Sequence, residues 1–213
     1  MINLKEVYRY MGIKGSAGIS AELEKRISEV SAEAESLSNF KTLSKYFEII
    51  FEDSGYIDLG FAKTRSKALR KNLEGCGKIL LFAATLGMDF EKRLSFYSAN
   101  SPVDALAMQA VGTELLEEKI DMFLKEKEEK EGLGFRPRFS PGYGDLELSL
   151  QREIFEELKP EKYIGVYLAD SLLMIPSKTV TAICGVCSER QKKSAKNKCA
   201  LCKNKNCSYR KED

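Results

Sequence analysis

Histidine is absent from the 213-residue sequence. This absence excludes Ser/His and Cys/His nucleophilic pairs, general base catalysis by imidazole, and histidine metal ligands. Any chemistry that the chain supports must therefore use other groups. Proline is also scarce, at 5 residues, and the hydrophobic content of 43% is sufficient for a packed core. This composition excludes a disordered chain and predicts one large domain with a short appendage.

Long apolar runs are missing as well. The longest, residues 79–87, contains small residues and a glycine, and it is far shorter than the ~20 residues that span a bilayer. We therefore expect a buried strand there and no membrane partner. The first six residues lack the basic and then apolar order of a secretory signal, which predicts a cytoplasmic protein.

Charge is distributed unevenly along the chain. Residues 188–213 contain nine Lys or Arg and three Asp or Glu, a net charge of +6, whereas the whole chain carries +2. The remainder is therefore acidic, at about −4, and this argues against a nucleic-acid-binding domain. The basic tail alone could contact a polyanion.

Apolar spacing and turn residues indicate an α+β fold with a largely antiparallel sheet, because helices and strands do not alternate regularly. Ser20 is a predicted N-cap, and Ser101 followed by Pro102 predicts the start of a long helix. The predicted elements are helices at residues 23–37, 66–73, 88–97, 101–127 and 148–158, a β-hairpin at 42–59, and strands at 78–85, 163–168 and 179–186.

The most informative stretch follows the long helix and reads RFSPGYGD (residues 138–145). Gly142 and Gly144 on either side of Tyr143 predict a tight turn with positive φ, where the backbone can approach a ligand closely. The stretch lacks the lysine and the hydroxyl residue of a Walker loop, and its glycine spacing does not match a dinucleotide fingerprint. A plain structural turn would explain the glycines by themselves, but the adjacent Arg138 guanidinium could bind a carboxylate through two hydrogen bonds.

This stretch and two later ones, IGVYLADSLLMIP (164–176) and KTVTA (178–182), occur in the same order as in a known family. Together they resemble the activation domain of cobalamin-dependent methionine synthase, and in particular the separate small proteins that supply this domain. YRYMG (8–12) and AATLG (83–87) extend the likeness upstream more weakly.

The resemblance implies a C-shaped α+β domain with a twisted antiparallel sheet flanked by helices, which binds S-adenosylmethionine. The family motif R-x-x-x-G-Y corresponds to Arg138, Gly142 and Tyr143, and Ser140 stands at a position that contacts the ligand through its backbone. An acidic residue of the preceding long helix completes the family site. The alignment places it at Glu117, with Glu114 or Glu118 as alternatives if the register differs.

The resemblance also implies a reaction, reductive methylation in methionine biosynthesis. An external electron donor reduces Co(II) cobalamin on a partner methionine synthase, and the resulting Co(I) takes the methyl group from the sulfonium. Co(I) is itself a strong nucleophile, so a protein base is not required and the lack of histidine is no obstacle. The chain would then be one component of a methyltransferase system. Another corrinoid methyltransferase could be the partner, or the chain could be a metal-binding regulatory or scaffold protein.

Cysteines concentrate at the end of the chain, in two C-x-x-C pairs and one further residue: Cys184, Cys187, Cys199, Cys202 and Cys207. Such pairs are typical of metal knuckles, because both thiolates face the same side of a turn. Zinc or another structural metal, an iron–sulfur cluster, and free or disulfide-forming thiols are all possible states of these cysteines.

We divide the chain into a ligand-binding domain, residues 1–183, and a basic Cys-rich tail, residues 184–213. Cys76, isolated between glycines, is expected to be a small buried residue.

Overall fold

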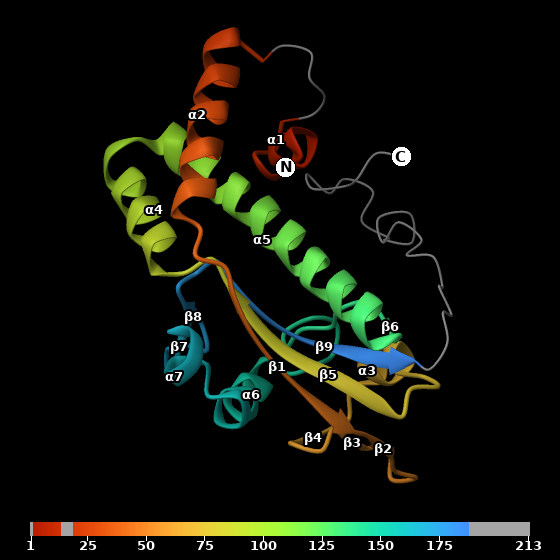
Figure 1. The fold of residues 1–213 in the computed structure, drawn as a ribbon. Coiled ribbons are helices and arrows are strands. Elements are labelled where there is room, and N and C mark those ends of the chain that lie inside the picture. The colour runs from red at the N-terminus through yellow and green to blue at the C-terminus, as the bar shows by residue number, and fades with distance from the viewer. Residues whose placement is uncertain (1, 14–18, 188–213) are drawn as a thin grey trace.

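The computed structural model describes residues 2–13 and 19–187, and it confirms the α+β class. A twisted four-stranded antiparallel sheet lies between a group of four helices and a group of shorter elements (Figure 1). Its strand order is β1-β5-β9-β6. The strands are β1 (Lys41–Glu48), β5 (Lys78–Thr85), β6 (Gly134–Phe135) and β9 (Thr179–Cys187).

Four helices lie on one side of this sheet and share a buried core with it; three of them pack against the fourth, which crosses the sheet. Val7, Ile27, Phe90 and Met108, one from each helix, belong to the same buried cluster as Phe82 of β5. The longest of the four runs diagonally across the sheet (Figure 1). The helices are α1 (Leu4–Tyr10), α2 (Ala21–Leu37), α4 (Met88–Asn100) and α5 (Pro102–Glu131).

Shorter elements cover the opposite face and bury a second core. Leu69, Ile154 and Ile164 from three of these elements cluster with Leu81 of β5 and Ile183 of β9. The elements are β2 (Ile50–Phe51), β3 (Ile57–Asp58), β4 (Lys63–Thr64), α3 (Lys67–Asn72), the 3-10 turn η1 (Leu148–Leu150), α6 (Gln151–Leu158), α7 (Pro160–Ile164), β7 (Tyr167–Leu168) and β8 (Met174–Ile175).

The two central strands are buried on both faces, which is unusual for an antiparallel sheet. In β5, all residues after Lys78 are buried. Alternate side chains enter the two cores, so that Leu80 and Phe82 face the four helices while Ile79 and Leu81 face the shorter elements. The predicted strand at residues 78–85 is thus confirmed with the same bounds.

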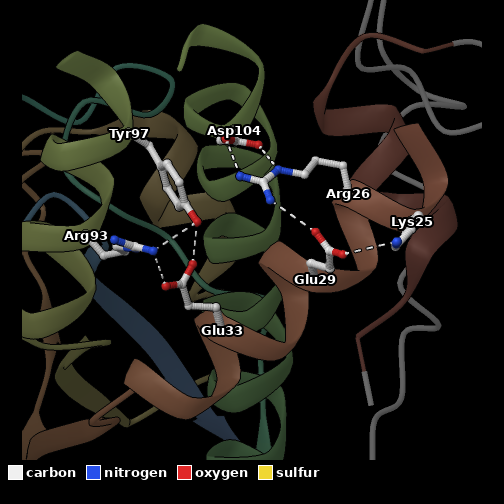
Figure 2. A network of polar contacts seen from close by, with 7 residues as sticks. All are labelled: Lys25, Arg26, Glu29, Glu33, Arg93, Tyr97 and Asp104. Atoms are coloured by element: carbon white, nitrogen blue, oxygen red, sulfur yellow. Dashed lines mark hydrogen bonds and ion pairs between the residues drawn. The ribbon is translucent and has the colours of Figure 1, made fainter. Parts of the chain in front are cut away.

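A network of charged and phenolic side chains joins α2, α4 and α5 beside the first core (Figure 2). Arg26 of α2 donates to both carboxylate oxygens of Asp104, with Nη2 at 2.6 Å from Oδ2. This fork holds the pKa of Asp104, which is buried, below its usual value. Two turns further along α2, the Glu33 carboxylate accepts a hydrogen bond from the Tyr97 hydroxyl and pairs with Arg93 at 2.6 Å. The network fixes the orientation of the helix group at its outer end.

All five predicted helices are present, the last of them with η1 as its first turn. Ser20 caps α2 through its hydroxyl, which accepts from the backbone N–H of Leu23. Ser101 and Pro102 stand at the start of α5 as expected, although the Ser101 side chain makes no capping hydrogen bond and the helix continues to Glu131 instead of ending near residue 127.

Two predictions about strands were wrong. Residues 163–168 are not one strand, because Pro160 begins the short helix α7 and only Tyr167–Leu168 pair. The predicted hairpin at residues 42–59 shrinks to Ile50–Phe51 against Ile57–Asp58. Its first part is β1, which pairs with β5 along its whole length. Long-range pairing in the sheet thus prevailed over the local turn.

Two further observations concern predictions about the whole chain. Within residues 2–13 and 19–187, no helix is long and apolar enough to cross a membrane. Strand β9 continues to Cys187, past the domain boundary that we predicted at residues 183 and 184.

Gly112 permits α5 to approach α4 closely. A Cβ at this position would lie 2.3 Å from Cζ of Phe90, whose ring is fully buried, and 3.1 Å from Cε of Lys178. We expect Gly112→Ala to lower the free energy of unfolding by about 1 to 3 kcal/mol, because overpacking outweighs the better helix propensity of alanine. Urea unfolding measures the change. Adding Phe90→Leu should make the cost of Gly112→Ala smaller, whereas additive effects of the two substitutions would contradict this explanation.

Candidate functional site

The segment that carries Arg138 is fastened to the edge of β9. The backbone N–H of Arg136 donates to the Gly185 carbonyl at 2.8 Å, and Phe139 and Ile183 exchange two hydrogen bonds of 2.9 Å. Pro137 between them has no N–H to contribute. Residues 134–139 therefore extend the sheet irregularly and deliver Arg138 to its edge.

The other end of the RFSPGYGD stretch is fastened to helix α3. The Asp145 carboxylate accepts from the backbone N–H groups of Lys67 and Ala68, at 2.8 and 3.1 Å, and from the Ser66 hydroxyl. These bonds, with that of Ser66 first, lower the pKa of Asp145. An anion at the start of a helix is favourable because the first N–H groups have no partner within the helix.

Between these two anchors the chain makes the predicted tight turn. Gly142 and Gly144 have φ values of 84° and 62°, in the region that favours glycine. The Tyr143 N–H donates to the Ser140 carbonyl at 3.1 Å, and the Gly142 N–H donates to the Leu146 carbonyl at 2.8 Å. The Tyr143 ring stands edge-on to Phe139, with a centroid distance of 5.3 Å, and 59% of Tyr143 is exposed. The turn thus presents an aromatic ring to solvent on a rigid base.

Arg138 reaches from the edge of the sheet to helix α5. Its Nη2 donates to Oε2 of Glu117 at 2.7 Å and to Oδ1 of Asp121 at 3.0 Å. The Arg138 side chain is 21% exposed, whereas Glu117 and Asp121 are 41% and 70% exposed. One mostly buried cation therefore faces two carboxylates at the surface. Glu117, the acidic residue chosen from the resemblance, is in direct contact with Arg138.

Lys178 contacts helix α5 one turn before Glu117. Its Nζ donates to Oγ1 of Thr113 at 2.9 Å, and Thr113 precedes Glu117 by four residues, so both lie on the same side of the helix. Burial lowers the pKa of Lys178 to about 8, against the opposing effect of Glu91 on α4. Arg138 and Lys178 thus approach the same side of α5 from two different parts of the chain.

The structure therefore brings Arg138 and Glu117 together and places Ser140, Gly142 and Tyr143 on the turn that follows Arg138. Sequence reasoning gave no role to Asp121, Thr113 or Lys178. A signal was available for two of them, because residues 113, 117 and 121 repeat at four-residue spacing on one helical face. The lysine could not be found in this way, since only tertiary packing brings it to α5.

The predicted metal ligands are only partly described. Cys199, Cys202 and Cys207 lie outside the described residues, so the proposed knuckle stays a prediction. Cys184 and Cys187 belong to β9 and point to opposite faces of the sheet, Cys184 into the core beneath the four helices and Cys187 toward the other core. Among the described residues, no group of three or more Cys, Asp or Glu could hold a metal ion.

Because Lys178 titrates at an unusually low pH, it should make the free energy of unfolding depend on pH. Its pKa in the folded state, about 8, is below the ordinary value of 10.5, so between these values the unfolded state binds more protons. Raising the pH through this window therefore stabilises wild type relative to Lys178→Met, by about 1 kcal/mol per pH unit. Urea unfolding of both proteins at several pH values from 7 to 10 tests this, because other titrating groups cancel in the difference. A difference independent of pH would contradict the shifted pKa.

Comparison with known proteins identifies the fold. No family model matches the sequence, and no curated protein matches it. Among solved structures, the chain is similar to the crystal structure of the MetH reactivation domain bound to AdoHcy, with a TM-score of 0.61 at 16% sequence identity. The match covers 86% of this chain and 73% of that chain. The protein therefore has the fold of the MetH reactivation domain, as the sequence motifs predicted.

Proposed function

We propose that the chain binds S-adenosylmethionine at Arg138, Glu117 and the glycine turn, and that it supports reductive methylation of Co(II) cobalamin on a partner methionine synthase. The observation that carries this proposal is the ion pair of Arg138 and Glu117 beside the turn, on the fold of a domain whose crystal structure contains AdoHcy. The described body of the chain, without the tail, would then be the binding unit.

The charges of this site suit the amino-acid end of the ligand. A methionine moiety carries one carboxylate and one ammonium group, and the ion pair offers a cation and an anion 2.7 Å apart. Entry of the zwitterion exchanges one ion pair for two, with the carboxylate on Arg138 and the ammonium on Glu117. Because each charge keeps a partner of opposite sign, binding leaves no buried charge unpaired.

The glycine turn contributes shape more than charge. Positive φ at Gly142 lets the backbone come close to a ligand without a Cβ in the way. The Tyr143 ring, held edge-on by Phe139, would form a wall beside the bound molecule and exclude water from one side. Ser140 would act through its backbone, whose carbonyl already closes the turn.

The role of the protein in such a reaction is positional. When bound, S-adenosylmethionine supplies an activated methyl group on a sulfonium centre, and a corrinoid carried by a partner accepts it after an external donor has provided an electron. The chain must hold the methyl group in line with the acceptor, and it need not move a proton. A site built from an arginine, a glutamate and a turn, without histidine, meets these requirements.

Arg138 should dominate ligand affinity. We expect Arg138→Ala to weaken binding of S-adenosylmethionine by about 1 to 3 kcal/mol, or roughly 5- to 150-fold, because the ligand carboxylate loses a charged hydrogen-bond partner. Arg138→Lys should fall between wild type and Arg138→Ala. Titration calorimetry gives the affinities, with Arg152→Ala, which removes an exposed guanidinium on α6, as the matched control. Unchanged affinity in Arg138→Ala would remove this residue from the site.

The two carboxylates should behave differently. Glu117→Gln should weaken binding, because Glu117 is proposed to hold the ligand ammonium. Asp121, which is more exposed, only competes for Arg138, so Asp121→Asn should leave the affinity unchanged or raise it severalfold. The same calorimetry separates the two. Equal losses in both variants would contradict the assignment of Glu117.

The reaction itself requires a partner protein. Visible spectra of a Co(II) corrinoid protein, mixed with this chain, S-adenosylmethionine and a reductant, should show formation of the methylated corrinoid, and much less with Arg138→Ala. Methionine synthase and other corrinoid methyltransferases can be compared in this assay to identify the client. If no corrinoid protein is methylated while the ligand still binds, the proposed activator role is wrong.

A further inference from the structure

Two cysteines that are far apart in sequence meet beside the second core. The Sγ atoms of Cys76 and Cys187 are 3.2 Å apart, across 111 residues of chain. Cys76 lies in the turn between α3 and β5, where its N–H donates to the Leu73 carbonyl at 2.9 Å. Cys187 is the last residue of β9.

The register of the central strands creates this contact. Ile79 of β5 pairs with Gly185 of β9, so the turn before β5 lies against the end of β9. A Cβ on Gly185 would be 2.7 Å from Sγ of Cys76, so this glycine makes the room that the Cys76 thiol occupies. Cys187 follows two residues later on the same face of the strand.

Cys184, the cysteine nearest to Cys187 in the sequence, cannot replace Cys76 as its partner. Cys184 is three positions before Cys187, and an odd separation in a strand puts two side chains on opposite faces. Cys184 is fully buried in the core beneath α5. As long as β9 stays paired, Cys187 can therefore react with Cys76 and not with Cys184.

The two thiols differ in access to solvent. Cys76 is only 5% exposed. Cys187 is partly exposed. A reagent from solution thus meets Cys187 first, and Cys76 lies behind it.

We propose that Cys76 and Cys187 form a thiol–disulfide couple that exchanges with low-molecular-weight disulfides of the glutathione type. In the first step, the Cys187 thiolate attacks the small disulfide RSSR, and a mixed disulfide forms with release of one RSH. In the second step, Cys76 loses its proton and attacks Sγ of Cys187, which releases the second RSH. Two protein thiols are oxidised to one disulfide, and RSSR is reduced to two RSH.

Formation of this bond would constrain the C-terminal end of β9. It ties the end of the strand to the beginning of β5 and closes a long loop, which stabilises the folded state mainly by restricting the unfolded chain. It also withdraws Cys187 from any metal site in the tail. The segment that carries Arg138 is attached to the same strand through the hydrogen bonds of Arg136 and Phe139. The disulfide would therefore stabilise the edge of the sheet to which this segment is bound.

The test uses the full chain, equilibrated with oxidised and reduced glutathione, followed by alkylation of the remaining thiols and peptide mapping by mass spectrometry. The expected result is one dominant cross-link between Cys76 and Cys187, with loss of two hydrogens, and a Tm about 5 to 15 °C higher than that of the reduced protein. A variant with Cys199, Cys202 and Cys207 all replaced by Ser should form the same bond. Cys76→Ser should abolish the bond and the rise in Tm.

Other outcomes would overturn the proposal. These are a cross-link from Cys187 to Cys184 or to a tail cysteine, or a Cys76 that stays reduced while Cys187 carries only glutathione. If Cys76→Ser does not fold, Gly185→Ala provides a second check, because its methyl group displaces the Cys76 thiol and should lower the yield of the bond severalfold. Cross-linking is measured without S-adenosylmethionine or a corrinoid, so its failure would leave the proposed function untouched.

Discussion

The pairing of β5 with β9 is the constraint on which the rest of the molecule depends. Eight consecutive residue pairs join these strands, from Lys78 with Val186 to Thr85 with Thr179. Since both strands are buried on both faces, they form the boundary between the two cores and belong to each. A change in their register by one residue would exchange the side chains of the two cores. The pairing is therefore fixed by packing on both sides at once.

Strand β9 also serves as the support for the features to which we assign function. Lys178 immediately precedes it and contacts Thr113 of α5. Ile183 in its middle holds Phe139, and through it the segment with Arg138. Cys187 at its end lies against Cys76. This strand thus carries Lys178 and Cys187 at its two ends, and it positions Arg138 and Cys76, which come from other parts of the sequence.

Helix α5 supplies the opposing surface. Its buried side, with Met108, Val111 and Leu115, packs into the first core, which fixes the rotation of the helix. With that rotation fixed, Glu117 and Asp121 must face the edge of the sheet where Arg138 arrives. The ion pair beside the glycine turn is hence a consequence of core packing and does not depend on the pair's own small contribution to stability.

Sequence reasoning succeeded where the signal is local and strong. The run of apolar residues in β5, the Ser20 cap of α2, and the paired glycines at 142 and 144 each have a physical cause within a few residues. It failed where local signals were ambiguous. Residues 163–168 are rich in aromatic and β-branched side chains, yet Pro160 starts a helix there. The turn at residues 52–55 suggested a long hairpin, but β1 gains more by pairing with β5, where it covers a buried strand.

The sequence by itself determined the α+β class, the two central strands and the tight turn, because residue type and spacing specify these, whereas the choice of Arg138 as a site residue rested also on the resemblance to a known family. Only the tertiary structure decided that Arg138 meets Glu117 and Asp121, that Lys178 joins the same helix face, and that Cys187 lies against Cys76 on the side of the sheet away from Cys184. The reason is that such contacts follow from strand register and from the rotation of a packed helix. Both are set by the burial of many side chains together, and no short stretch of sequence contains that information.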